Sequence, residues 1–304
     1  MSGTQEDCTA ALVTGSTKVV LGTTASTATI SDLVTVSQGA ALSNVHNCTA
    51  IFTLGVEDLV SNLMSGSSST VISSGLNAII TDDSDVKINV TNQIMQVSIL
   101  NTLNDKTIGR ITVTDDSPVL SGNASDSNTA LGAGSTVISG IDNAGIILTD
   151  TSLDISVLNT LNANTTGSVN ASSITTLSGA AADCNTAYSV NATDGEIIGL
   201  GNENITLSDT TLAVSVLNTL DNNTSGTINA NTITTLTGTA AACNKAYSSA
   251  GSGNILNLGG EAITLTDTTL AASVLNTLDG NTSGKINANT ITTLTGTAAD
   301  VTQL

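Results

Sequence analysis

Residues 205–243 read ITLSDTTLAVSVLNTLDNNTSGTINANTITTLTGTAAAC, and residues 263–301 repeat them with six changes in thirty-nine positions. An older copy begins at Ile146, and a degenerate one is visible at 97–103. The first leucine of the LNTL phrase falls at Leu100, Leu158, Leu217 and Leu275. These positions fix a period of 58 or 59 residues. Self-similarity at a fixed period indicates an array in which each unit buries its apolar face against its neighbours.

The first part of each unit predicts a short amphipathic helix over 210–220. Its apolar residues fall on one helical face, at Leu212, Val216, Leu217 and Leu220. Asp209 is the expected N-cap, and it recurs as Asp150 and Asp267. Asn222 and Gly280 stand where the helix should end in left-handed geometry. We therefore expect Leu158, Leu217 and Leu275 to be equivalent and buried.

The second part of the unit predicts a strand over 227–236, a helix over 239–247 and another extended segment over 255–265. Each unit would then consist of two β-α halves of about 29 residues, a length typical of one turn of a leucine-rich-repeat-like coil. The fold class expected is α/β, an elongated solenoid of short parallel strands and short helices. An intertwined homotrimeric β-rich fibre would place the same apolar stripes on a three-fold axis and is the alternative.

Residues 1–75 fit the repeat poorly and form the expected N-terminal attachment region. Residues 17–37 favour short β segments because they are rich in Val, Ile and Thr. A brief helix is predicted over 56–63, followed by a Ser-Gly loop over 64–70.

The rest of the chain is expected to be repetitive. Residues 76–140 hold the degenerate repeat, and residues 141–304 hold the regular repeats. Arrays of this kind need an atypical capping segment. Because residue 304 falls inside a unit, we expect the array to continue beyond it.

The charge and composition exclude several classes of protein. Six basic against twenty-five acidic residues give a formal charge of -19, so nucleic acid is not an expected partner. No run of eighteen apolar residues occurs, and we expect no membrane insertion. The first fifteen residues lack the pattern of a secretory signal, because Glu6 and Asp7 stand where lysine or arginine is expected. The chain has no Trp, one Phe and two Tyr, so its core must be built from small aliphatic side chains.

No catalytic, cofactor-binding or metal-ligating residue is predicted, and no cofactor. The only histidine, His46, lies two positions from Cys48 in the least regular region, which argues against a catalytic triad. Neither 81–85 nor Asp115 with Asp116 has the spacing of a calcium loop. Cys184 and Cys243 occupy one repeat position, where Val301 replaces them in the next copy.

This repeat position favours a small buried apolar residue rather than a redox or metal role. Cys184 and Cys243 would lie roughly 10 Å apart in a stack of strands, too far for a disulfide, so we expect none between them. Whether Cys8 pairs with Cys48 is left open by the sequence.

The phrase LNTLDGNT at 275–282, with related phrases at 158 and 217, resembles repeats common in phage tail-fibre and appendage proteins. The longer phrases SVLNTLDGNTSG and TTLTGTAAD are similar to repeats in cyanophage fibres and in giant surface proteins of marine cyanobacteria. The resemblance covers about 141–304. It implies an elongated structural or host-contact protein, and it brings no catalytic residues with it.

The expected function is therefore structural and non-enzymatic, a virion appendage with its N-terminus anchored and its repeats projecting. The expected partners are other virion structural proteins, bound through the N-terminal region, and a host surface receptor beyond the array. We also expect a homo-oligomer, with a trimer as one form. A cyanobacterial cell-surface or extracellular matrix protein is the alternative, and it moves the expected localisation from the virion to the cell surface.

Overall fold

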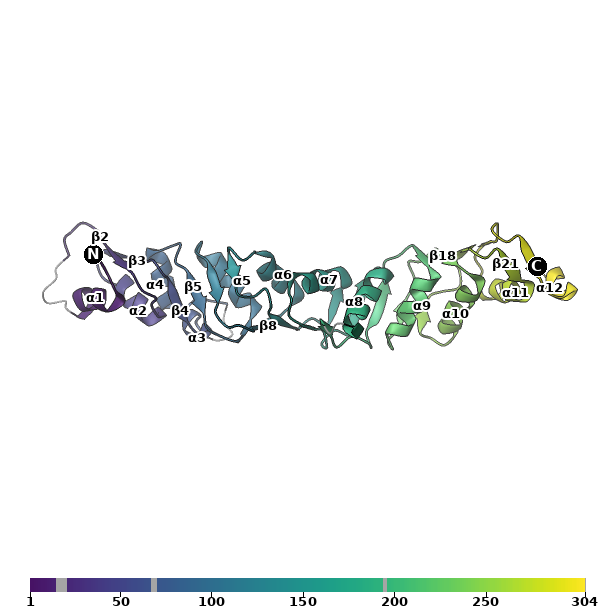
Figure 1. Cartoon of the computed structure of the whole chain (residues 1–304), viewed down its shortest axis with the longest axis horizontal. Coiled ribbons are helices and arrows are strands. Elements are labelled where there is room, and N and C mark those ends of the chain that lie inside the picture. Colours follow the sequence, from purple (N-terminus) through teal and green to yellow (C-terminus); the bar gives the residue numbers. More distant parts are fainter. Residues whose placement is uncertain (15–20, 67–69, 194–195, 304) are drawn as a thin grey trace. The chain divides into compact units, whose positions relative to one another are not determined.

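The computed structural model describes residues 1–14, 21–66, 70–193 and 196–303, and it is an α/β protein with short parallel strands in several sheets (Figure 1). The chain forms two compact units. The first comprises residues 1–149 with 161–169, and the second comprises 150–160 with 170–304. The expected α/β class with short parallel strands is thus confirmed. No described helix combines the length and apolar character that a membrane span requires.

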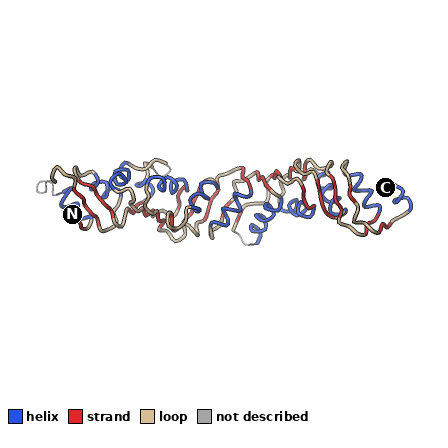
Figure 2. Tube along the Cα trace, turned by 90° about the horizontal axis from the view of Figure 1, so that it is seen from above, coloured by secondary structure: helices blue, strands red, loops and turns tan. Residues whose placement is uncertain are grey.

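The first unit alternates helices with strands of two to five residues (Figure 2). Its helices are α1 (Gln5–Thr9), a π-helical turn (Ala10–Thr14), α2 (Val36–Ser43), α3 (Val60–Leu63), α4 (Ser74–Asp82), α5 (Val97–Lys106) and α6 (Ala124–Gly132). Its strands are β1 (Ser2–Gly3), β2 (Ser26–Ile30), β3 (Cys48–Phe52), β4 (Val56–Asp58), β5 (Ile88–Val90), β6 (Ile94–Gln96), β7 (Ile111–Val113), β8 (Val119–Gly122), β9 (Ile138–Ser139) and β10 (Gly145–Leu148).

The second unit has the same alternation. Its helices are α8 (Ala181–Thr193), α9 (Val214–Asn223), α10 (Ala240–Gly251), α11 (Ala272–Asn281) and α12 (Ala298–Thr302). Its strands are β11 (Ser152–Asp154), β13 (Thr176–Gly179), β14 (Ile197–Ile198), β15 (Asn204–Leu207), β16 (Thr211–Ala213), β17 (Ile228–Asn229), β18 (Thr235–Gly238), β19 (Ile255–Leu256), β20 (Ala262–Leu265), β21 (Thr269–Ala271), β22 (Ile286–Asn287) and β23 (Thr293–Thr295). Helix α7 (Ile155–Asn164) and strand β12 (Val169–Asn170) are divided between the units.

The strands pair in parallel within each unit. In the first unit the orders are β1-β2-β3, β4-β5-β7-β9 and β6-β8-β10. In the second they are β11-β13-β15-β17-β19, β16-β18-β20-β22 and β21-β23. Apolar residues at alternate positions of these strands point into the core, as Leu236 and Ile263 do across β18 and β20. Leu158, Leu217 and Leu275 are all buried, as predicted.

The spacing of paired strands corrects the expected half-length of 29 residues. Leu153 pairs with Leu177, and Leu177 pairs with Ile205, so the chain returns twice to the same sheet within 52 residues. The sequence equivalent of Leu153 is Leu212, seven residues beyond Ile205, and it lies in the next sheet of the unit. Paired residues of the second unit are 23 to 28 positions apart. The repeat is therefore longer than two returns of the chain.

The helix in the first part of each repeat begins and ends at other residues than the sequence predicts. Helix α9 begins at Val214 rather than Thr210, because residues 211–213 pair as strand β16. Its N-cap is Ala213, and Asp209 instead accepts the backbone N–H of Ala181 at the start of α8, at 2.8 Å. Asp267 does the same for Ala240 of α10. The aspartate therefore caps the helix of the preceding return, a contact that local sequence does not reveal.

The predicted left-handed ends at Asn222 and Gly280 are wrong. Both residues lie inside their helices, which end at Asn223 and Asn281. The C-caps are Thr224 and Thr282, in extended conformation. Each hydroxyl donates to a carbonyl of the preceding return, Thr224 to Glu203 at 2.8 Å and Thr282 to Glu261 at 3.2 Å. A tertiary bond thus ends the helix where a local glycine turn was expected.

The other expected segments are partly corrected. The strand predicted over 227–236 is two strands, β17 and β18, separated by a turn, and the segment 255–265 is likewise divided into β19 and β20. The helix predicted over 239–247 is α10, which starts at Ala240 with Thr239 as its N-cap and continues to Gly251.

In the N-terminal region, residues 56–58 form β4, so only α3 remains of the helix predicted over 56–63. Within 17–37 the structure has strand β2 and the start of α2, while residues 17–20 of that prediction lie outside the described residues. Residues 67–69 of the predicted loop also lie outside them.

Candidate functional site

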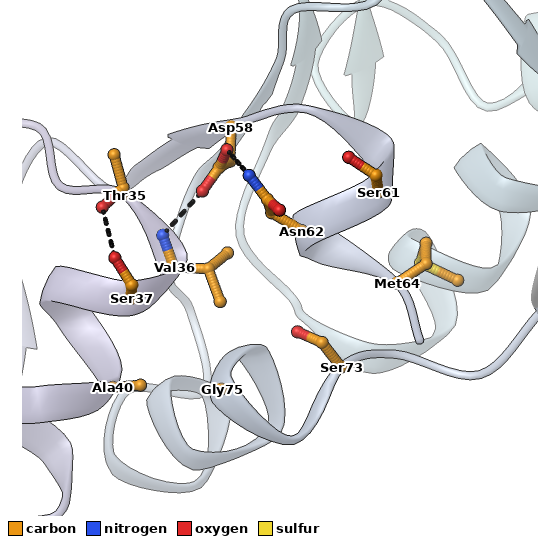
Figure 3. A pocket seen from close by; sticks show the side chains of 10 residues that line it. All are labelled: Thr35, Val36, Ser37, Ala40, Asp58, Ser61, Asn62, Met64, Ser73 and Gly75. Carbon is orange, nitrogen blue, oxygen red and sulfur yellow. Dashed lines mark hydrogen bonds between the residues drawn. The ribbon is translucent and has the colours of Figure 1, made fainter. Parts of the chain in front are cut away.

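A cleft of about 450 Å³ lies between helices α2, α3 and α4 of the first unit (Figure 3). It is lined mainly by small polar side chains, with three helix starts around it. The lining residues are Thr35, Val36, Ser37, Ala40, Asp58, Ser61, Asn62, Met64, Ser73 and Gly75. Asp58 is the single ionisable group among them.

Both oxygens of Asp58 are engaged in holding the surrounding backbone. Oδ2 accepts the Val36 N–H at 3.0 Å, which caps helix α2 from the following return. Oδ1 accepts the Leu59 N–H at 2.9 Å and the side-chain amide of Asn62 at 2.7 Å, as Figure 3 shows for Asn62 and Val36. A carboxylate that accepts three hydrogen bonds is stabilised in its ionised form and is poorly placed to take a proton from a substrate.

The hydroxyls of this cleft also serve the fold. Thr35 forms a capping box with Gln38, and Ser73 accepts the Leu76 N–H at 3.2 Å. No histidine, lysine or cysteine lines the cleft. A nucleophile needs an adjacent base to be activated, and this cleft supplies none. Its arrangement supports helix packing and, at most, weak binding of a polar group.

Two smaller clefts recur at one repeat position, with volumes of about 250 and 330 Å³. Each lies where a strand ends and the helices of two returns begin. The first is lined by Gln96, Ser98, Ser121, Gly122, Asn123, Asp126 and Thr149. The second is lined by Ala213, Val214, Ser215, Thr237, Gly238, Thr239, Ala242 and Thr266. Because the polar groups of the first are largely replaced by alanine and valine in the second, the pair shares a shape but no common chemistry.

The shape of these clefts depends on a glycine. Gly122 and Gly238 have positive φ angles of 157° and 150°. A Cβ atom on Gly238 would lie 2.5 Å from a methyl group of Val214, the first residue of the preceding helix. The glycine therefore lets the next helix pack closely, and the cleft results from that packing.

Buried tyrosine and glutamate side chains form a pair in two successive repeats of the second unit. The Tyr188 hydroxyl donates to Glu203 Oε2 at 2.7 Å, and the Gly201 N–H donates to the same oxygen at 2.9 Å. Tyr247 and Glu261 repeat the contact at 3.1 Å. Glu203 is 0% exposed and Glu261 is 4% exposed.

Burial, followed by the adjoining glutamate among the causes, raises the pKa of both phenols above its usual value. Tyr188 and Tyr247 therefore remain protonated at neutral pH and act as hydrogen-bond donors. Sequence equivalents in the preceding repeat are Leu131 and Ala144, an apolar pair. The tyrosine and glutamate thus appear together, which indicates a role in packing rather than in catalysis.

The cysteines are buried free thiols. Burial is the largest cause that raises the pKa of Cys184 to about 12 and of Cys243 to about 11, so neither forms a reactive thiolate near neutral pH. Both the expected burial and the absence of a disulfide between them are confirmed. Cys8 and Cys48, whose pairing the sequence left open, are also unpaired here. His46 is exposed.

Among the described residues, no group of three or more His, Cys, Asp or Glu side chains has the arrangement of a metal site. Asp82 and Asp83 accept backbone amides of β3, and Asp115 accepts the Ser117 N–H at 2.9 Å. These carboxylates are therefore committed to the backbone.

The contacts that sequence reasoning missed join successive returns. Besides the capping aspartate and the C-cap threonine, the asparagine of LNTL donates to a carbonyl of the next helix, as Asn218 does to Ala242 at 3.0 Å. The equivalent donors are Asn101, Asn159 and Asn276. A Thr-x-Gly sequence after each LNTL helix could have revealed the threonine contact, because it occurs at 107–109, 165–167, 224–226 and 282–284.

Comparison of the chain with protein-family models, curated proteins and solved structures gave no match.

Proposed function

We propose that this chain is a non-enzymatic structural protein whose returns stack as an α/β solenoid, with two returns and seven further residues in each repeat. The observation that carries the proposal is the recurrence of the same bonds between returns. The hydroxyls of Thr107, Thr165, Thr224 and Thr282 each donate to a carbonyl 21 residues earlier. The motif that is most constant in the sequence is thus spent on joining neighbours, as in a solenoid.

The proposed biological role is an elongated virion appendage of the phage-fibre kind. Residues 1–75 would attach the protein to other virion proteins, and the repeats from residue 141 would project toward a host surface. Support comes from the repeat phrases and from the chemistry of the clefts, whose one fully engaged carboxylate, Asp58, favours a scaffold over an enzyme. A regular array presents similar surfaces at every unit, so a unique attachment site is expected in the irregular region.

The geometry can be tested by changing the number of repeats. Residues 214–271 form one period of 58 residues, from the start of α9 to the position before the start of α11. Four additional copies of this segment would add eight returns, which at about 4.8 Å per strand lengthen the protein by about 40 Å. The matched control inserts the same number of residues as a Gly-Ser linker. Electron microscopy should show a rigid extension only for the repeat insertion, and a compact globule would overturn the proposal.

The localisation needs a separate test. Gene neighbours encoding capsid and tail proteins, together with the protein in purified particles, would support the appendage. Gold labels at the two termini should then lie close to the particle for residue 1 and far from it for the C-terminal end. Recovery only in a cell-surface fraction, beside secretion genes, would favour the matrix protein instead.

A further inference from the structure

The outer edge of strand β3 is held by side chains rather than by another strand. Strand β3 is the last strand of the β1-β2-β3 sheet. On its outer edge the Ala50 N–H donates to Asp82 Oδ2 at 3.0 Å, and the Phe52 N–H donates to Asp83 Oδ2 at 2.7 Å. Two consecutive carboxylates thus satisfy two alternate amides of the strand, in place of the carbonyls that a fourth strand would supply.

The position of these carboxylates is electrostatically costly. Asp82 is the last residue of α4 and Asp83 is its C-cap, where the negative end of the helix dipole disfavours acids. The Asp83 side chain belongs to a residue that is only 4% exposed. A third carboxyl, on Asp85, is hydrogen-bonded with Asp83. Two carboxyl groups can share a hydrogen bond only when one of them carries a proton.

The charged groups around Asp83 favour its protonation. Burial is the largest cause that raises the pKa of Asp83 to about 6, and the hydrogen bond and charge of Asp85 and the charge of Asp82 act in the same direction. The Phe52 amide acts in the opposite direction. On β3 itself, the titratable group is Cys48, which interacts with Asp82. Lys87 donates to the Thr53 carbonyl at 3.4 Å, just past the end of β3.

We propose that 82–85 is an acid-tightened latch on the edge of β3, in which protonation of Asp83 joins its carboxyl to Asp85 and secures the Ala50 and Phe52 amides to the end of α4. Loss of that proton leaves three neighbouring carboxylates that repel one another. The end of α4 then separates from β3 more often. This device couples the N-terminal sheet to pH, and it is independent of the function proposed above.

The sign of the pH dependence follows from linkage. The carboxyl of Asp83 binds its proton more tightly in the folded protein than in the open or unfolded chain, where its pKa is near 3.8. The stabilisation is therefore complete below about pH 4 and is lost as the pH rises through about 6. Mild acid should strengthen this edge, whereas paired carboxylates in most proteins weaken on acidification.

Amide hydrogen exchange of Ala50 and Phe52 in the full-length chain tests the proposal. After correction for the intrinsic rate, we expect protection at pH 5 to exceed protection at pH 7.5 by about tenfold. Asp83→Asn should give high protection at both pH values, because its carboxamide oxygen still accepts from Phe52 and its NH₂ group donates to Asp85. Asp85→Asn should do the same by donating to the ionised Asp83.

Asp116→Asn is the matched control, because Asp116 is an exposed acid of the same unit and should leave the tenfold difference intact. Circular dichroism verifies that each variant is folded, and either of the two latch variants suffices. Equal protection at both pH values in the unmodified chain would overturn the latch. A tenfold difference that persists in a folded Asp83→Asn or Asp85→Asn variant would overturn it as well.

Discussion

At the scale of single residues, the Thr-x-Gly sequence after each LNTL helix explains why the repeat is so constant. The Thr282 hydroxyl donates to the Glu261 carbonyl and also accepts the Gly284 N–H at 3.0 Å. A Cβ atom on Gly284 would lie 2.0 Å from the Glu261 carbonyl oxygen. Glycine is needed here because two backbones approach each other, although its φ angle is unexceptional.

We therefore expect Gly284→Ala to lower the free energy of unfolding by about 3 kcal/mol, because the backbone of one return must move away from the other. Gly280→Ala is the matched control four residues earlier, where nothing lies within 4 Å of the added methyl group. It should raise stability by about 0.5 kcal/mol through helix propensity. Urea titration of the two variants measures both effects. Similar stabilities would mean that the close approach at Gly284 does not exist in solution.

The thiols provide a second prediction at this scale. Because burial raises the pKa of Cys243 to about 11 and of Cys184 to about 12, we expect neither to react with iodoacetamide at pH 8 in the folded protein. Both should react fully in urea. Peptide mass spectrometry counts the carbamidomethyl groups, and it also detects the loss of two hydrogens that a disulfide would cause. Rapid labelling before unfolding would contradict the buried placement.

At the scale of elements, the buried tyrosine and glutamate link helix α10 to the segment before β20. Tyr247→Leu alone leaves Glu261 buried without its phenol donor, and Glu261→Ala alone removes the acceptor of the phenol. Each should cost about 1 to 3 kcal/mol. The double variant recreates the Leu131 and Ala144 pair of an earlier repeat, so it should cost less than the sum of the single changes. A double-mutant cycle from urea titrations measures the coupling, and an additive result would show that the two residues act independently.

Sequence reasoning identified the residues of the helices better than their boundaries. Leu158, Leu217 and Leu275 are buried as predicted, because the spacing of apolar residues along one helix is a local property. The starts and ends failed because Asp209 and Thr224 bond to other returns of the chain. An aspartate before a helical pattern is a sound local signal. Here the side chain serves the preceding helix, and only the fold brings the two together.

The candidate site shows the same division between local and distant information. The prediction that no triad forms around His46 rested on an inventory of residues, which needs no structure. The cleft around Asp58 could not be predicted, because it joins α2, α3 and α4 from three returns of different length. Its carboxylate accepts an amide 22 positions earlier in the chain. No motif marks such a contact, since the intervening residues carry no repeated phrase.

At the scale of the whole molecule, the contacts between neighbouring returns predict tolerance to the loss of a complete period. Deleting residues 214–271 joins Ala213 to Ala272, so the residue after the junction is the equivalent of the one removed. We expect this variant to fold and to unfold cooperatively, because every remaining return keeps its neighbour bonds. Deleting only 214–242 should disrupt folding, because the deleted length matches no period. Circular dichroism and hydrogen exchange distinguish the outcomes, and equal folding of both variants would show that register is not enforced.

The mismatch between the repeat and its two returns also shapes the surface of the second unit. Leu153 and Ile205 share a sheet, but Leu212, the equivalent of Leu153, stands seven residues farther along the return. Sequence and structure are therefore out of phase by this amount in each period, and identical side chains are carried around the axis instead of being stacked in a column. A planar lattice such as ice or a mineral face repeats by pure translation and would find no matching row. A flexible polymer that winds with the stripe would meet the same side chains once in every period.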